Sequence, residues 1–156
     1  MPQANFIECK ALGADVVINY KSESFVDRVL EATDKRGADV ILDFVGAPYW
    51  SQNLSVAALY GRLMLIGFLG GSQGQLDLGM IMGKSLTVVG TTLRRTPLDR
   101  KVALVDSFSQ TMLPHFATGE LRPVIHSIYP LSEAAEGHKT MENNSYIGKI
   151  VFIASE

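Results

Sequence analysis

Tyr20 and Lys21 carry polar chemistry at the end of a predicted strand. They follow the short β-branched run Asp15–Asn19. A tyrosine hydroxyl and a lysine ammonium at such a place suit a phosphate group or the edge of a ribose. A solvated turn that holds an amphipathic tyrosine accounts for the same residues equally well. Both interpretations stay open on these residues alone.

The run Gly79–Ser85 is similar to a phosphate-binding loop, but it is one residue shorter than the pattern G-x-x-x-x-G-K-S. A strand is predicted directly after Ser85, where phosphate binding needs a helix to aim its amide groups. We therefore interpret the run as a turn before a strand. The fingerprint G-x-G-x-x-G is also missing from the sequence.

Asp43 is an acidic residue inside an otherwise apolar predicted strand. An ionised carboxylate is costly in such a place unless it accepts hydrogen bonds. A role in shaping the turn at Val45–Gly46 is therefore favoured over a role as a catalytic acid. We assign no catalytic residue.

Metal-ligand spacing is not found among the histidines, and a single cysteine excludes a multi-cysteine zinc site. The residues concerned are His115, His126, His138 and Cys9. We expect no bound metal.

Elements with helical and β periodicity alternate along the chain. Helices are predicted over residues 3–12, 24–30, 48–59, 78–82, 97–114 and 132–143. Strands are predicted over residues 15–19, 39–45, 62–66, 86–91, 124–129 and 149–153. This alternation predicts an α/β fold with a mostly parallel sheet and helices on both faces. Ligands bind beyond the carboxyl ends of the strands in such sheets, so the strand ends are the candidate site.

Composition excludes several classes of function. The 156 residues suit one domain, and 14 basic against 16 acidic residues give no positive surface for nucleic acid. No apolar run is long enough to span a membrane, and the first residues do not form a signal peptide. We expect a cytoplasmic protein without membrane or nucleic-acid partners.

Six segments in order along nearly the whole chain carry a family resemblance. They read CKALGADVVINYK (9–21), GADVILDFVGAPYW (37–50), GRLMLIGFLGG (61–71), SLTVVGTTLRRT (85–96), LPHFATGEL (113–121) and EGHKTMENNSYIGKIV (136–151). The chain thereby resembles the zinc-independent quinone oxidoreductases of the medium-chain dehydrogenase/reductase family, and among them the p53-inducible NADPH type. The resemblance implies a Rossmann-type cofactor domain and hydride transfer from NADPH to a quinone or enone-like acceptor, with the nicotinamide carrying the chemistry.

The resemblance also implies contacts with NADPH at the strand ends. Tyr20 would contact the adenosine 2′-phosphate side, and Val45 and Gly46 would lie by the adenine ribose. Gly67, Phe68 and Leu69 would lie along the cofactor, and Thr92 and Leu93 would approach the nicotinamide. The turn that would close over the nicotinamide contains Asn144, Ile147, Gly148 and Lys149.

The resembling enzymes are about twice as long as this chain. The resemblance assigns residues 1–156 to the carboxyl-terminal portion of the dinucleotide-binding domain, without the GroES-like catalytic domain. It also implies that the first two strands of the usual Rossmann-type sheet and their glycine-rich turn are absent. That turn leads into the helix that neutralises the pyrophosphate. We therefore expect weak NADPH binding and negligible turnover by the chain alone.

A non-catalytic dimerisation or interaction module derived from such an enzyme is the alternative. Residues 86–91 correspond to the outer strand through which many family members pair, and an apolar edge strand is a ready pairing surface. A homodimer through this strand is therefore expected. A different α/β enzyme, such as a methyltransferase, fits the string DVILDFVG but needs a glycine-rich turn that the sequence lacks.

Overall fold

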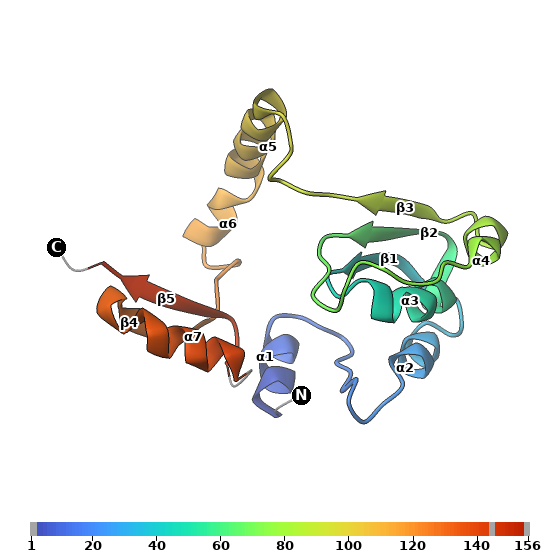
Figure 1. Ribbon diagram of the computed structural model, residues 1–156, viewed down its shortest axis with the longest axis horizontal. Coiled ribbons are helices and arrows are strands. Elements are labelled where there is room, and N and C mark those ends of the chain that lie inside the picture. Colours follow the sequence, from blue (N-terminus) through green and yellow to red (C-terminus); the bar gives the residue numbers. More distant parts are fainter. Residues whose placement is uncertain (1–2, 144–145, 155–156) are drawn as a thin grey trace. The chain divides into compact units, whose positions relative to one another are not determined.

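The computed structural model describes residues 3–143 and 146–154. The described residues form two compact units, residues 8–96 and residues 97–154 together with 3–7. Figure 1 shows the elements in sequence colours. Those up to residue 96 are α1 (Gln3–Ala11), α2 (Phe25–Ala32), β1 (Ala38–Asp43), η1 (Ala47–Tyr49), α3 (Trp50–Val56), β2 (Ala57–Leu65), α4 (Leu78–Gly83) and β3 (Thr87–Gly90).

The first unit contains a three-stranded parallel sheet in the order β1-β2-β3. Ile41, Leu63 and Val88 lie in register across its middle. Parallel neighbours need crossover connections, which α3 and α4 supply between successive strands (Figure 1). The predicted α/β fold class with parallel pairing is confirmed.

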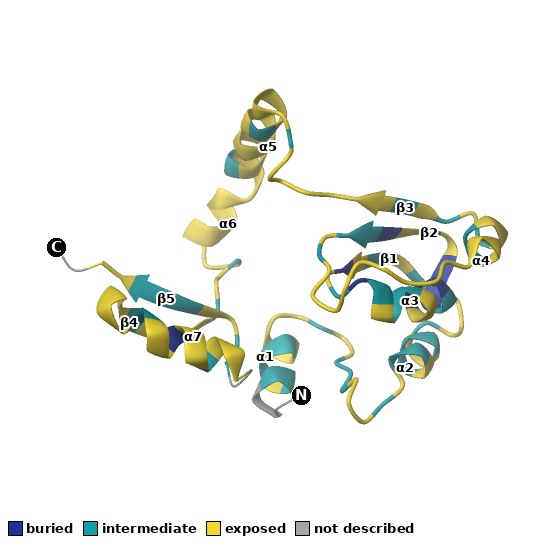
Figure 2. Ribbon diagram, in the orientation of Figure 1, coloured by how far each residue is buried: buried dark blue, intermediate teal, exposed yellow. Residues whose placement is uncertain are grey.

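The core of the first unit lies where α3 passes into β2. Leu54 on α3 and Leu63 on β2 are 0% and 1% exposed, and Val56, Ala57 and Ala58 are buried beside them. Figure 2 shows these buried residues in dark blue. Burial of each leucine side chain contributes about 1.5–3 kcal/mol to stability. This core fixes the two strands from whose ends the candidate site is built.

The strand predicted over Asp15–Asn19 is wrong. These residues pair with neither sheet. A strand is held by hydrogen bonds to a neighbouring strand, and its β-branched residues indicate only a preference for extended backbone. Tyr20 therefore follows an unpaired segment and not a strand of the sheet.

The helix predicted over 48–59 is shorter and the next strand longer than expected, since α3 ends at Val56 and β2 begins at Ala57. Lys84 holds this boundary, because its Nζ donates to the carbonyl oxygens of Leu54 at 2.9 Å and Ser55 at 2.7 Å in the last turn of α3 and of Ala57 at 2.8 Å at the start of β2. The carbonyls of a last helical turn lack partners within the helix, so this ammonium satisfies them and ends the helix there.

The structure of Gly79–Ser85 and the contacts of Lys84 bear on whether this run is a phosphate-binding loop. The strand expected after this run is confirmed, since β3 begins at Thr87. Most of the run is helix α4, however, and only Lys84 and Ser85 form the turn. The lysine that a phosphate would need is engaged with α3.

The second unit consists of α5 (Leu98–Thr111), α6 (Leu113–Ala117), β4 (Ile125–Pro130), η2 (Leu131–Glu133), α7 (Ala134–Glu142) and β5 (Lys149–Ile153). The predicted interruption at Pro114 is confirmed, because α5 stops at Thr111. β4 and β5 pair in parallel, and α7 connects them. Gly137 of α7 packs so closely on β5 that an added Cβ would lie 2.5 Å from Phe152 Cζ.

Candidate functional site

The carboxyl ends of the three strands of the first unit meet at one edge of the sheet, because the strands are parallel. Two segments follow β1 and β2 there: residues 44–47, which we call the first loop, and residues 67–71, the second loop. Thr91–Leu93 follow β3, and the Thr91 N–H donates to the Leu65 carbonyl of β2 at 3.0 Å. Strand ends of this kind are the usual place for ligands in parallel α/β sheets.

The two loops are joined by backbone hydrogen bonds. The Leu69 N–H donates to the Phe44 carbonyl at 3.0 Å, and the Gly70 N–H donates to the Val45 carbonyl at 2.8 Å. In the opposite direction, the Ala47 N–H donates to the Gly71 carbonyl at 2.9 Å. The two loops therefore form one continuous backbone surface.

Gly46 makes this joining possible. Its φ is +90°, a conformation that residues with a side chain rarely adopt. A Cβ at this position would lie 2.5 Å from the Gly71 carbonyl oxygen. Any larger residue would push the first loop away from the second.

Asp43 is the last residue of β1 and lies under the first loop. Its Oδ1 accepts from the N–H groups of Val45 at 2.7 Å and Gly46 at 3.0 Å, and its Oδ2 accepts from Asn53 Nδ2 at 3.0 Å. The predicted structural role of Asp43 in shaping the Val45–Gly46 turn is confirmed.

A hollow of about 820 Å³ opens beside the first loop. We call it the aromatic hollow, after the four aromatic side chains among its lining residues: Ile18, Tyr20, Phe25, Leu42, Asp43, Phe44, Val45, Pro48, Tyr49, Asn53, Leu69 and Gly70. Phe25 and Tyr49 meet edge to face, with ring centroids 5.3 Å apart. Its apolar walls with a few polar groups are the composition of small-molecule sites in general.

Tyr20 reaches the aromatic hollow from a turn that polar contacts hold together. The N–H groups of Ser22 and Glu23 donate to the Asn19 carbonyl at 2.9 and 2.8 Å, and the Asn19 N–H donates to the Glu23 carboxylate at 2.9 Å. The Lys21 N–H donates to the Asn19 side chain at 3.3 Å. Tyr20 is 52% exposed as a residue, so it is available to a ligand.

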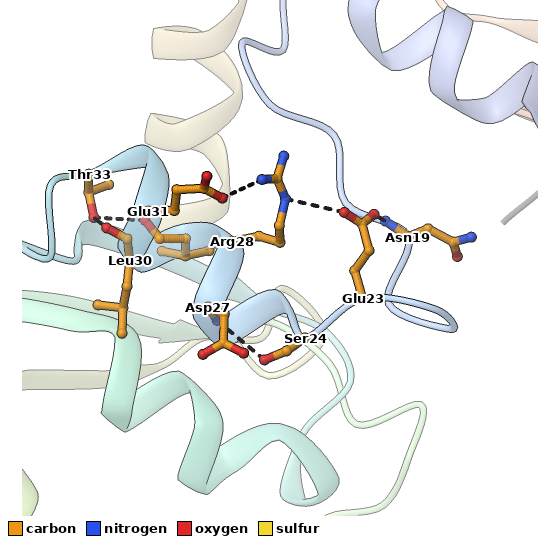
Figure 3. Close-up of polar contacts among 9 residues, drawn as sticks. Asn19, Glu23, Ser24, Asp27, Arg28, Leu30, Glu31 and Thr33 are labelled. Atoms are coloured by element: carbon orange, nitrogen blue, oxygen red, sulfur yellow. Dashed lines mark hydrogen bonds and ion pairs between the residues drawn. The ribbon is translucent and has the colours of Figure 1, made fainter.

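Helix α2, which follows this turn, is fixed at its start (Figure 3). The predicted cap is confirmed, because the Asp27 N–H donates to Ser24 Oγ at 3.3 Å. Arg28 pairs with Glu23 at 3.2 Å and also with Glu31, so it ties the helix to the turn that carries Tyr20 (Figure 3).

Two smaller hollows adjoin the second loop. One of about 370 Å³ is lined by Leu65, Ile66, Gly67, Phe68, Gly90, Thr91 and Thr92, from the ends of β2 and β3. The other, of about 200 Å³, is lined by Gly46, Ala47, Trp50, Leu65, Phe68, Ser72, Gly74, Gln75 and Leu76. Trp50 begins α3 there, and its buried indole Nε1 has no hydrogen-bond partner within the described part of the chain.

The predicted site residues divide between these places. Tyr20, Val45 and Leu69 line the aromatic hollow, and Gly67 and Thr92 line the hollow at the ends of β2 and β3. The others of the first unit lie in or beside the loops; they are Gly46, Phe68 and Leu93.

The remaining predicted contacts belong to the second unit or fall outside the described residues. Ile147, Gly148 and Lys149 lead into β5, where the Lys149 N–H donates to the Val124 carbonyl at 2.8 Å. Asn144 lies outside the described residues.

Phe25, Tyr49 and Asn53 line the aromatic hollow without having been predicted as site residues. Phe25 has the spacing of a packing residue on α2, and Tyr49 beside Pro48 is typical of core packing. Asn53 lies ten positions from Asp43, its hydrogen-bond partner across the hollow floor. Only the preference of a buried carboxylate for a donor could have indicated that some such residue was needed.

The groups with shifted pKa values lie at the amino-terminal ends of the strands, away from the two loops. Partial burial lowers the pKa of the Lys84 ammonium below its ordinary 10.5. At the far end of β1, a hydrogen bond from the Arg36 guanidinium lowers the pKa of the Asp39 carboxyl, and the same contact raises the pKa of Arg36. Asp43 is the acidic residue in the lining of the aromatic hollow.

Two other kinds of site were sought over residues 3–143 and 146–154. No three His, Cys, Asp or Glu side chains in these ranges gather as metal ligands would. None of the helices described is both long and apolar enough to pass through a membrane.

Known structures resemble the whole chain. Escherichia coli quinone oxidoreductase in complex with NADPH matches 99% of this chain with a TM-score of 0.82 at 27% identity, over 47% of its own length. An NAD-dependent alcohol dehydrogenase matches 99% with a TM-score of 0.77 at 28% identity, over 42% of its length. The fold, the loops at the strand ends and these matches together define the chain as part of a Rossmann-like domain of the medium-chain dehydrogenase/reductase class.

The sequence comparison specifies the family. Residues 12–152 match the zinc-binding dehydrogenase family, and the chain belongs to that family. The quinone oxidoreductase-like protein 2 homolog of Nematostella vectensis is 29% identical over 141 residues, which are 90% of this chain and 38% of that protein. The chain thus spans less than half the length of the relatives described here.

Proposed function

We propose that this chain is part of an NADPH-dependent oxidoreductase that delivers a hydride to a quinone or enone-like acceptor. Its family and its similarity to a quinone oxidoreductase in complex with NADPH support the proposal. The observation that carries it is the aromatic hollow at the carboxyl ends of the parallel strands, with Tyr20, Val45 and Leu69 in its lining. In this proposal NADPH supplies the hydride, and the chain holds and orients it.

The residues fit the adenosine portion of such a cofactor. The aromatic hollow is within the size range of small-molecule sites, about 300–1,000 Å³. Its aromatic walls suit a purine ring. Tyr20 and Val45 are in its lining. In the proposal Tyr20 contacts the 2′-phosphate side, and Val45 and Gly46 lie beside the adenine ribose.

The rest of the cofactor would follow the loops. Gly67, Phe68 and Leu69 offer backbone along its length, and Thr92 and Leu93 stand where the nicotinamide would be approached. The proposal also assigns nicotinamide contacts to Ile147, Gly148 and Lys149 and to Asn144, as the family resemblance implies. These assignments follow the family resemblance, and no metal takes part in them.

In this proposal residues 1–156 correspond to the carboxyl-terminal portion of the cofactor domain, and these residues contain no G-x-G-x-x-G turn. Neutralising a pyrophosphate needs a glycine-rich turn and the helix that follows it. We therefore expect a dissociation constant for NADPH in the millimolar range, about −4 kcal/mol of binding free energy, and negligible turnover.

The proposal also includes a reducing, cytoplasmic compartment, which suits the single cysteine, Cys9.

Calorimetric titration of the purified chain with NADPH tests this proposal. Binding in the millimolar range is expected, and Tyr20→Ala is expected to weaken it severalfold. Tyr60→Ala is the matched control, since Tyr60 is an exposed tyrosine away from the aromatic hollow. Absence of binding at millimolar NADPH would contradict a retained cofactor site. Micromolar binding of NADPH, or oxidation of NADPH with a small quinone, would contradict the proposal that the cofactor site of this chain is incomplete.

A dimerisation module is the second candidate, and one observation favours it. β3 is the last strand in the order β1-β2-β3 and pairs with β2 alone among the described strands, so we infer that its other edge pairs with β3 of a second copy. Analytical ultracentrifugation tests this candidate. A dimer that dissociates on Val88→Pro is expected, because the Val88 N–H lies on the edge of β3 that faces away from β2. A monomer at high concentration would exclude the candidate.

A further inference from the structure

Asp43 and Asn53 form a small buried polar unit, which we call the polar latch. They are 4% and 7% exposed, the two buried polar residues among those described. The Asp43 carboxylate accepts three hydrogen bonds, two from backbone N–H groups of the first loop and one from Asn53. A buried carboxylate is stable only with such donors, so the positions of the donors and of the carboxylate depend on each other.

The first loop transmits this dependence to the second. The peptide units of Val45 and Gly46 turn their N–H groups inward to Asp43. The carbonyls of Phe44 and Val45 then accept from Leu69 and Gly70 of the second loop. If the carboxylate no longer oriented the inner N–H groups, the carbonyls that hold the second loop would lose their fixed direction as well.

Asn53 connects the latch to the core. It lies in the middle of α3, directly before Leu54, which is fully buried. A side chain held by a packed helix has little freedom, so Asn53 ties the ends of β1 and β2 to the rigid part of the unit.

We propose that Asp43 and Asn53 are positioning residues that together set the placement of both loops, and through them the affinity for the nucleotide. The part about affinity rests on the function proposed above; the part about the loops does not. Both residues also line the floor of the aromatic hollow, so a direct contact with the ligand is the alternative that the test must separate.

The chemistry of the pair allows a reciprocal exchange. In Asp43→Asn, the new amide keeps an oxygen for the loop N–H groups but faces Asn53 with an NH₂, so the Asn53 amide must turn over to accept from it. In Asn53→Asp, two carboxylates face each other. The double variant D43N/N53D restores one acceptor opposite one donor, with the charge moved to α3. If Asp43 and Asn53 act by positioning the loops, the double variant must recover the wild-type loop placement and affinity. If the Asp43 carboxylate contacts the ligand directly, the double variant cannot recover the affinity.

Amide hydrogen exchange of the ¹⁵N-labelled chain reads the loops without any nucleotide. In D43N, exchange at Gly46, Ala47, Leu69 and Gly70 is expected to rise by about tenfold or more, and in D43N/N53D to return close to wild type. Leu63→Ala is the control for general destabilisation, because Leu63 is 1% exposed and outside the loops. Asn53→Ala, which removes only the donor on α3, serves if D43N does not fold.

The outcomes separate the possibilities. Faster exchange confined to Gly46 and Ala47, with Leu69 and Gly70 unchanged, would overturn the proposal. So would uniform acceleration over the whole sheet that equals that of Leu63→Ala, or failure of the double variant to recover. An NMR titration with NADPH then tests affinity: D43N should bind about tenfold more weakly and the double variant should recover. If wild type does not bind NADPH, the proposed function fails while the exchange result still decides the latch.

Discussion

The ammonium of Lys84 lies 2.7 Å from the Ser55 carbonyl oxygen, 29 residues away in the sequence, and within 3 Å of two further carbonyls at the end of α3. A lysine within a loop-like glycine motif thus serves as the cap of a neighbouring helix. The contact fixes where α3 ends, and so where β2 enters the sheet.

Replacing Lys84 by Met is expected to destabilise the chain by about 1–3 kcal/mol, because the methionine keeps the apolar stem but leaves three carbonyls without their donor. Urea unfolding measures the change. Lys35→Met, at an exposed lysine, is the control and should have little effect. An equal loss in both variants would show that the cap adds nothing.

Lys84 also predicts a pH dependence. Its pKa lies below 10.5 in the folded chain because burial disfavours the charged form. Between that lowered pKa and 10.5 the unfolded chain holds more protons than the folded chain, so this group alone makes stability rise with pH there. Comparison of unfolding free energies of wild type and Lys84→Met across this window should reveal the rise in wild type only. A ¹³Cε titration of Lys84 at or above 10.5 would contradict the assignment.

Gly46→Ala is expected to cost about 1–3 kcal/mol and to separate the two loops, since its φ is +90° and its Cβ would meet the Gly71 carbonyl at 2.5 Å. Urea unfolding gives the loss, and exchange at the Ala47 amide reports the separation. Gly83→Ala is matched to it: no atom lies within 4 Å of a Cβ at that position, and its stability should barely change. If Gly46→Ala changes neither the unfolding free energy nor exchange at the Ala47 amide, the two loops are joined in another way.

In the second unit, Gly137→Ala should destabilise by about 1–3 kcal/mol through overpacking, because the added Cβ would lie 2.5 Å from Phe152 Cζ. Phe152→Leu in the same chain should recover part of that loss by vacating the space. Thermal unfolding of the two single variants and the double variant measures the coupling. Strict additivity would indicate that α7 does not rest on Phe152.

Lys21→Ala tests the preference between nucleotides. Under the proposed function, loss of this exposed ammonium should weaken NADPH binding by a few fold and leave NADH binding unchanged, because only NADPH carries the 2′-phosphate. NMR titrations with both nucleotides decide this. Equal weakening of the two would place Lys21 elsewhere along the cofactor.

Most of the elements and their alternation could be predicted from the sequence, because apolar periodicity, the Ser24 cap and the interruption at Pro114 are local signals. The failures concern long-range pairing. Asp15–Asn19 has the residue types of a strand but no ladder in either sheet. The boundary between α3 and β2 depends on Lys84, about 30 residues further along.

The candidate site could be located in part by the same reasoning. The rule that ligands bind at strand ends led to the two loops, and the cost of a buried carboxylate led to the structural role of Asp43. Phe25, Tyr49 and Asn53 could not be found this way, since their place in the aromatic hollow depends on how α2 and α3 pack.

The single tryptophan of the chain gives the first loop an intrinsic optical reporter. Trp50 shares a hollow with Gly46 and Phe68, and its indole nitrogen is buried without a hydrogen bond to the described residues. Indole emission shifts to the red when water reaches the ring. Opening of the two loops should therefore shift the emission maximum of Trp50 to longer wavelength. No label is needed, and no second tryptophan contributes to the signal.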